Sequence, residues 1–178
     1  MLPRNVKKIV VFVYSFVFFV GNLQYFVGNF HTMSPDTIFQ LCSGIAVLGW
    51  LILIIASPLI LEIDKFLVGI VIAILCIVYL WLIVSSFAFE DIKNFGSLNG
   101  VMEIFKDKTL VTAGWVHYLA FDLLTGCWIK RNSARHGIPH LVIIPVLLLT
   151  FLLGPVGLFL YLFIRWGKTR RYFATNYN

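Results

Sequence analysis

A histidine and a carboxylate lie inside a long apolar stretch of this sequence, and they are the first candidates for chemistry. The stretch runs from Thr109 to Trp128 and contains His117 and Asp122. An ionisable side chain at membrane depth is costly, so it usually faces protein or a water-filled pocket. Asp122 is the only acidic residue well within any apolar segment of the chain. A histidine exchanges protons near neutral pH, so this pair suits proton transfer on an apolar substrate without a cofactor.

The spacing of these residues predicts which of them share a helix face. Tyr118 precedes Asp122 by four residues and shares its face, and Trp115 extends that face by a further three residues. His117 is five residues before Asp122, about 140° away around the helix axis. His117 and Asp122 would therefore flank a cavity, each with a partner from another helix. The alternative is that both are hydrogen-bonding residues that hold helices together.

His140 is a third candidate, at the start of the last apolar segment. Pro139 suits the first turn of a helix, and the positive helix end beside His140 favours a neutral imidazole. His136 and His140 have the spacing of a metal-binding pair on a helix, but Pro139 argues against a continuous helix there. We therefore predict no metal site.

We expect His117, Asp122 and His140 to converge on one cavity lined by aromatic and aliphatic side chains. Such convergence requires Pro145 to bend the last segment, or His140 to lie deeper than its sequence position suggests. The cavity would hold an apolar ligand against a few placed polar groups.

The composition indicates that lipid surrounds most of the chain. The 178 residues are 60% hydrophobic and 12% charged, with a mean hydropathy of +0.93. A soluble domain could not hide so much apolar surface. The net charge of +6 indicates contact with anionic lipid headgroups. No basic stripe alternates with aromatic residues on a polar surface, so nucleic acid is not a predicted partner.

Five apolar segments are long enough to cross a bilayer, which takes about 20 helical residues. Helices satisfy their own backbone hydrogen bonds in lipid, so the predicted fold is an all-α, polytopic membrane helical bundle. Its transmembrane helices are expected at residues 9–30, 37–61, 66–89, 110–128 and 139–166. The first segment has a basic start but no small-residue cleavage site, so we expect it to be retained.

Positive charge does not orient this five-helix arrangement. One face of the membrane would collect seven lysines and arginines, namely Arg4, Lys7, Lys8, Lys65, Lys130, Arg131 and Arg135. The other would also collect seven, namely Lys93, Lys106, Lys108, Arg165, Lys168, Arg170 and Arg171. The positive-inside rule needs an imbalance, and this arrangement has none.

The sequence around the candidate residues resembles a known family. The resemblance is carried by Phe95-Gly96-Ser97-Leu98, Trp115-Val116-His117-Tyr118-Leu119-Ala120-Phe121-Asp122-Leu123, Gly137-Ile138-Pro139-His140 and Leu149-Thr150-x-x-x-Gly154-Pro155-x-Gly157. These residues look like the bacterial branch of the abscisic-acid-deficient-four-like family. The family pattern has no counterpart of the first segment. We therefore expect an extra membrane helix at residues 1–35, a four-helix family domain at 36–178, and a multi-pass protein of the bacterial inner membrane.

The resemblance also implies a reaction. Plant members of the family are chloroplast-envelope proteins required to make neoxanthin from violaxanthin, which opens an epoxide to an allenic alcohol without redox change. An intramolecular isomerase acting on a carotenoid or related isoprenoid lipid is therefore implied, with no cofactor. By analogy, His117 would be the base and Asp122 the acid or its orienting partner, with His140 as a further catalytic candidate. Trp115 and Tyr118 would bind the substrate.

Two other functions stay open. The protein could be a non-catalytic lipid-binding or assembly subunit whose polar residues only lock the helices together. A transporter is disfavoured, because the chain has few intramembrane charges and no inverted repeat.

Overall fold

The computed structural model describes residues 33–57, 60, 62–86 and 89–170, and every element in these ranges is helical. The all-α prediction is therefore confirmed for the described part of the chain. The predicted helix at residues 9–30 lies outside the described residues. So does the proposed N-terminal unit, except for its last three residues, 33–35.

Two long helices and a short helical linker come first. The first long helix joins α2 (Pro35–Leu51) to the π-helical turn η1 (Ile52–Ala56). The second is made of α3 (Ile63–Phe66), the π-helical η2 (Leu67–Ile72) and α4 (Ala73–Ser86). The linker that follows holds the 3-10 helix η3 (Phe89–Gly96) and α5 (Leu98–Ile104).

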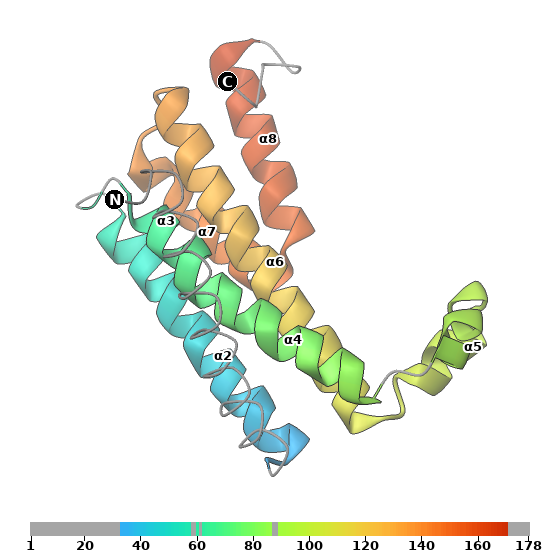
Figure 1. The fold of residues 1–178 in the computed structure, drawn as a ribbon. Coiled ribbons are helices and arrows are strands. Elements are labelled where there is room, and N and C mark those ends of the chain that lie inside the picture. Colours follow the sequence, from blue (N-terminus) through green and yellow to red (C-terminus); the bar gives the residue numbers. More distant parts are fainter. Residues whose placement is uncertain (1–32, 58–59, 61, 87–88, 171–178) are drawn as a thin grey trace, which may run out of the picture.

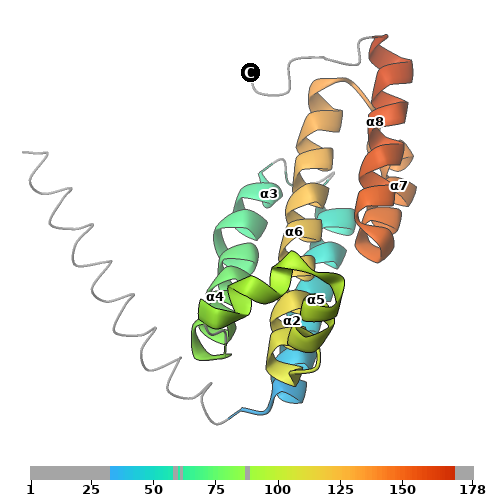
Figure 2. The same ribbon diagram turned by 90° about the vertical axis from the view of Figure 1, so that its right-hand side faces the viewer.

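Three further helices complete the bundle: α6 (Lys108–Arg135), α7 (His140–Leu153) and α8 (Pro155–Thr169). Asp107 caps the start of α6, because its Oδ1 accepts from the backbone N–H groups of Thr109 and Leu110 at 2.7 and 3.0 Å. The long helix α6 lies at the centre. It packs against α2 and α4 on one side and against α7 and α8 on the other (Figures 1 and 2).

The last apolar segment departs from its prediction. Instead of one bent helix over residues 139–166, the chain forms the antiparallel pair α7 and α8, joined at Gly154 (Figures 1 and 2). Gly154 has a φ of +24°, in the region that favours glycine. Pro155 has no N–H, and in a continuous helix its ring would clash with the Phe151 carbonyl. The single-helix prediction is wrong, because hydropathy measures the length of an apolar run and not its direction.

The hairpin of α7 and α8 is about half as long as α6. At 1.5 Å per residue, the 28 residues of α6 span about 42 Å and the 14 residues of α7 about 21 Å. The Tyr118 hydroxyl on α6 donates to the Leu152 carbonyl near the hairpin tip at 3.1 Å. The Tyr161 hydroxyl on α8 donates to Asn132 Oδ1 near the end of α6 at 2.6 Å. The tip therefore lies beside the middle of α6, and α8 returns to its C-terminal end.

The outer surfaces of these helices are apolar. Large side chains that point outward include Leu48, Ile55, Leu80, Val84, Leu141 and Phe159, each at least 60% exposed. Two helices, Pro35–Ala56 and Ile63–Ser86, are long and apolar enough to cross a membrane. An exposed apolar surface of this extent is unusual for a soluble monomer, so the fold favours association with a membrane.

Glycine lets α2 and α6 approach closely, as small residues do where membrane helices cross. A Cβ added at Gly126 would lie 2.7 Å from Trp50 Cη2 and 2.9 Å from Leu53 Cδ2. On the other helix, a Cβ at Gly49 would lie 2.9 Å from Leu123 Cδ2. The α2–α6 contact therefore depends on the absence of these two side chains.

We expect Gly126→Ala to destabilise the protein by about 1–3 kcal/mol, the usual cost of overpacking a filled core. Gly44→Ala in α2 is the matched control, because a Cβ there meets nothing within 4 Å and alanine is the better helix former. Thermal unfolding in detergent should show a lower Tm for Gly126→Ala alone. An equal loss in both variants would show that the close contact of α2 with α6 is not the cause.

Candidate functional site

Asp122 lies near the middle of α6 and faces the tip of the α7–α8 hairpin. Its side chain is buried, at 9% exposure, and a Cβ added at Gly154 would lie 3.0 Å from Asp122 Cγ. Gly154 immediately precedes Pro155, the first residue of α8, so the carboxyl group faces the positive end of that helix. Within the described residues, Asp122 Oδ2 has no hydrogen-bond partner.

A row of aromatic side chains continues this face of α6. Trp115 Nε1 donates to Ser43 Oγ at 2.9 Å, and the Trp115 ring stacks on Phe39 at a centroid distance of 5.2 Å. The Tyr118 ring also stacks on Trp115, at a centroid distance of 5.4 Å. As predicted, Trp115 and Tyr118 lie on the face of Asp122, and α2 and the end of α7 hold them there.

This arrangement presents one carboxyl group to an apolar environment. Exposed apolar side chains flank the turn at Gly154, namely Leu152, Leu153 and Val156. A carboxyl oxygen that has no hydrogen-bond partner among the described residues can donate or accept a proton at a ligand that reaches it. We define Trp115, Tyr118, Asp122 and Gly154 as the tip site.

His117 lies on a different face of α6. Its ring stacks on Phe121 at 4.6 Å and lies 5.3 Å from the ring of Tyr79 on α4. It lines a cavity of about 310 Å³ between α4, α5 and α6. The cavity walls include Ile83, Phe95, Ile104, Phe105 and Leu110, so the imidazole has apolar neighbours there.

His140 lies at the C-terminal end of α6, where the first residues of α7 meet η1. Its Nε2 is 2.9 Å from the Ile54 carbonyl oxygen, and its Nδ1 is 3.4 Å from Ser57 Oγ. Because a carbonyl only accepts, Nε2 must carry a hydrogen. His136 is turned elsewhere, with Nδ1 2.8 Å from the Asn132 carbonyl of its own helix.

The structure does not bring His117, Asp122 and His140 together, so the predicted convergence is wrong. His117 and Asp122 are separated by their angle around α6, and the hairpin tip covers Asp122 alone. Pro145 lies within α7, yet His140 stays at the start of that helix. Among the described residues, no group of three histidine, cysteine, aspartate or glutamate side chains could hold a metal ion.

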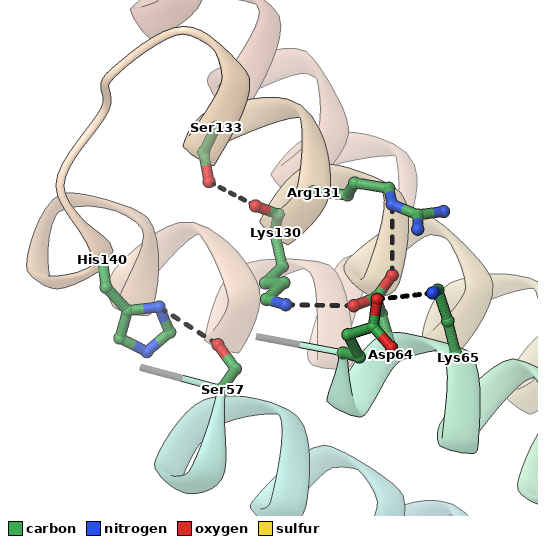
Figure 3. Close-up of polar contacts among 8 residues, drawn as sticks. Ser57, Asp64, Lys65, Lys130, Arg131, Ser133 and His140 are labelled. Carbon is green, nitrogen blue, oxygen red and sulfur yellow. Dashed lines mark hydrogen bonds and ion pairs between the residues drawn. The ribbon is translucent and has the colours of Figure 1, made fainter. Parts of the chain in front are cut away.

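Sequence reasoning missed a buried ion-pair cluster at the C-terminal end of α6. Lys130 Nζ lies 3.0 Å from Asp64 Oδ1, and Arg131 Nε lies 3.3 Å from Asp64 Oδ2 (Figure 3). Asp64 and Lys130 are 5% and 8% exposed. Hydropathy ended the predicted helix at Trp128 and left both cations in a linker, whereas α6 continues to Arg135.

A second polar contact joins α6 to α8. Tyr161 and Arg165 are four residues apart on α8, and both point at Asn132 Oδ1, at 2.6 and 3.4 Å. All three side chains are buried. The i,i+4 spacing of Tyr161 and Arg165 within an apolar segment was the available signal for this contact.

We expect Gly154→Ala to destabilise the hairpin, because alanine is strained at this φ and its Cβ collides with the Asp122 carboxyl. Asp122→Ala removes the collision but not the strain. A double-mutant cycle from unfolding in detergent should therefore give a coupling of about 0.5–3 kcal/mol. Additive losses would show that Asp122 does not rest on Gly154.

The search of curated proteins and the search of solved structures gave no match. Residues 37–161, which include the tip site and nearly all of the two long helices that precede it, match the family described as ABA DEFICIENT 4-like. This chain therefore belongs to the ABA DEFICIENT 4-like family.

Proposed function

We propose that this protein is a multi-pass membrane isomerase that opens the epoxide of a carotenoid or related isoprenoid lipid, with Asp122 as its proton-transferring group. Family membership links the chain to membrane proteins of neoxanthin synthesis. The observation that carries the proposal is the buried carboxyl of Asp122, whose Oδ2 has no partner within the described residues. An unpartnered buried oxygen is costly unless a ligand meets it.

The chemistry needs one proton given and one proton taken. Protonated Asp122 gives its proton to the epoxide oxygen, and the bond from that oxygen to the carbon beside the polyene breaks. The Asp122 carboxylate then removes the hydrogen from the adjacent polyene carbon. The electrons of that C–H bond form the second double bond of the allene, and the oxygen stays on the other ring carbon as a hydroxyl. The carboxyl ends protonated, as it began.

One carboxyl serves both steps in this proposal. His117 was the base in the prediction from the resemblance, but its imidazole faces α4 and α5 rather than the tip site. The Tyr118 ring, between Trp115 and the hairpin tip, would hold the substrate against Asp122. The exposed apolar residues at the tip would let a lipid-dissolved substrate approach sideways.

The proposed membrane arrangement has α2, α4 and α6 crossing the bilayer, with the α7–α8 hairpin entering and returning on one side. A non-helical tip inside a membrane is tolerated where protein buries it, and Gly154 is buried against Asp122. With this hairpin, the positive charge of the described residues is unequal between the two ends of the bundle. Among the described residues, seven cations then lie at the C-terminal end of α6, namely Lys65, Lys130, Arg131, Arg135, Arg165, Lys168 and Arg170. Three lie at the other end, namely Lys93, Lys106 and Lys108. The positive-inside rule places the richer end in the cytoplasm.

Activity would be measured with the purified full-length protein in liposomes, with violaxanthin as the probe. We expect formation of an allenic isomer of equal mass, detected by chromatography and mass spectrometry. Asp122→Asn keeps the shape but not the acid, so the rate should fall by about 100-fold or more. Glu103→Gln removes an exposed carboxyl and should have no effect.

Three outcomes would contradict the proposal. Full activity in Asp122→Asn would exclude the tip site as the source of the proton. A loss in His117→Gln as large as that in Asp122→Asn would favour a two-residue mechanism. Binding of violaxanthin without conversion, measured by quenching of tryptophan fluorescence, would favour a non-catalytic lipid-binding subunit.

The hairpin topology has its own test, by labelling single cysteines with a membrane-impermeant maleimide after Cys42, Cys76 and Cys127 are replaced by alanine. We expect Ala134→Cys and Lys168→Cys to be labelled from the same side of the membrane, and Asn99→Cys from the opposite side. If the last segment crossed the bilayer as one helix, Lys168→Cys would be labelled together with Asn99→Cys.

A further inference from the structure

A polar pocket lies at the C-terminal end of α6, away from the tip site. It has a volume of about 350 Å³ and is bounded by Ser57, Asp64, Lys130, Arg131, Arg135 and His140. The ends of η1 and α6 and the starts of α3 and α7 meet there (Figure 3). The proposed isomerisation does not use this pocket.

Positive charge is in excess in the pocket wall. Asp64 supplies one negative charge, which Lys130 and Arg131 share through its two carboxylate oxygens. Arg135 also lines the pocket, one helical turn beyond Arg131 and on the same face of α6. A buried ion pair is weak evidence for stability, because desolvation offsets the attraction. Lys130 and Arg131 together carry more charge than the one carboxylate that they share, and this favours an anionic ligand.

The guanidinium group of Arg131 is available to bind an anionic ligand. It contacts Asp64 through Nε, and its two terminal nitrogens point away from that carboxylate in Figure 3. The side chain is 52% exposed, so the nitrogens can reach a ligand at the pocket mouth. A guanidinium presents paired N–H groups that match the oxygens of a phosphate.

The start of α7 adds to the positive potential. This 14-residue helix begins at His140, and its N-cap residue Pro139 makes no side-chain hydrogen bond to it. The amide groups of its first turn carry partial positive charge, which favours an anion. Ser57 supplies a hydroxyl on the opposite wall.

Apolar surface adjoins the pocket on the two helices that border it. Phe66, two residues after Asp64, is 47% exposed, and Leu141, next to His140, is 80% exposed. A polar pocket beside an exposed apolar surface suits a molecule with a charged headgroup and acyl chains. A free phosphate ion would make no contact with the apolar surface.

We propose that this pocket binds the phosphate of an anionic membrane phospholipid, with Arg131 and Arg135 as its main contacts and the acyl chains along α3 and α7. The lipid would hold η1, α3, α6 and α7 together at the membrane interface. The proposal rests on the membrane arrangement above and not on the isomerase activity, so it stands if the protein proves to be non-catalytic.

The test uses delipidated full-length protein in a neutral detergent, titrated with dioleoylphosphatidylglycerol while thermal unfolding is followed. We expect this lipid to raise the Tm in a saturable manner. Dioleoylglycerol, which has the same chains without the phosphate, should not. Arg131→Gln should weaken the apparent affinity by about tenfold, the scale of one lost charge-assisted hydrogen bond, and the double variant with Arg135→Gln should weaken it further.

Two controls keep the result interpretable. Arg131→Gln leaves Asp64 paired with Lys130, so its Tm without lipid should stay near that of the wild type. Lys168→Gln removes an exposed cation from the same end of the molecule and should leave the lipid affinity unchanged. An equal loss of lipid affinity in Lys168→Gln would show that only the overall positive charge attracts the lipid. That result would overturn the assignment of the lipid to this pocket.

Inorganic phosphate distinguishes the source of the anion. We expect it to bind far more weakly than the phospholipid, because it lacks the apolar contacts. Equal affinity for phosphate would overturn the lipid assignment and identify a site for a soluble phosphate compound. A Tm that neither probe changes would overturn the proposal entirely.

Discussion

The fold depends on one backbone break, at Gly154 and Pro155. A proline within an apolar helix removes one hydrogen bond and displaces the carbonyl four residues back, and the glycine before it adopts a φ of +24°. Together they reverse the chain near the middle of α6. Asp122 faces the resulting tip, and a side chain at residue 154 would occupy the position of its carboxyl. The buried carboxyl of Asp122 therefore requires glycine at residue 154, and the turn at Gly154 leaves room for that carboxyl.

The same break determines what gathers at the far end of the bundle. Because α8 runs back alongside α6, Tyr161 and Arg165 reach Asn132, and the cations at the end of α8 join those at the end of α6. The bundle is thus polarised, with one carboxyl at half its depth and a surplus of positive charge at one end. The surplus of charge at this end would not follow if the last segment ran straight, because Arg165, Lys168 and Arg170 would then lie at the opposite end.

Much of the fold could be predicted from hydropathy and helix periodicity. Helices were expected at residues 37–61, 66–89 and 110–128, and they occur at residues 35–56, 63–86 and 108–135, because hydropathy predicts the presence of a helix better than its ends. The common face of Trp115, Tyr118 and Asp122 followed from their spacing. The angle of about 140° between His117 and Asp122 also followed from their spacing. This angle is the reason why the two side chains do not share one cavity. The catalytic role of these residues stays a prediction.

What escaped prediction depends on long-range geometry. The Gly154-Pro155 pair was visible in the sequence, but a kinked helix and a hairpin satisfy the same hydropathy. Lys130 and Asp64 are distant in sequence, and each lay in a linker between predicted helices, whereas α6 extends beyond its apolar core to Arg135. The sequence also could not predict that Asp122 Oδ2 would have no hydrogen-bond donor among the described residues, including those of the hairpin tip.

The half-length of the hairpin has a mechanical consequence for the surrounding lipid. In the proposed arrangement, the described helices fill one leaflet with five cross-sections, those of α2, α3, α6, α7 and α8, and the other with three, those of α2, α4 and α6. With a helix diameter of about 10 Å, the two leaflets differ in occupied area by on the order of 200 Å², since each extra cross-section covers about 80–100 Å². In that arrangement the described part of the chain is a wedge, and it fits a bilayer whose hairpin-side leaflet is on the convex side.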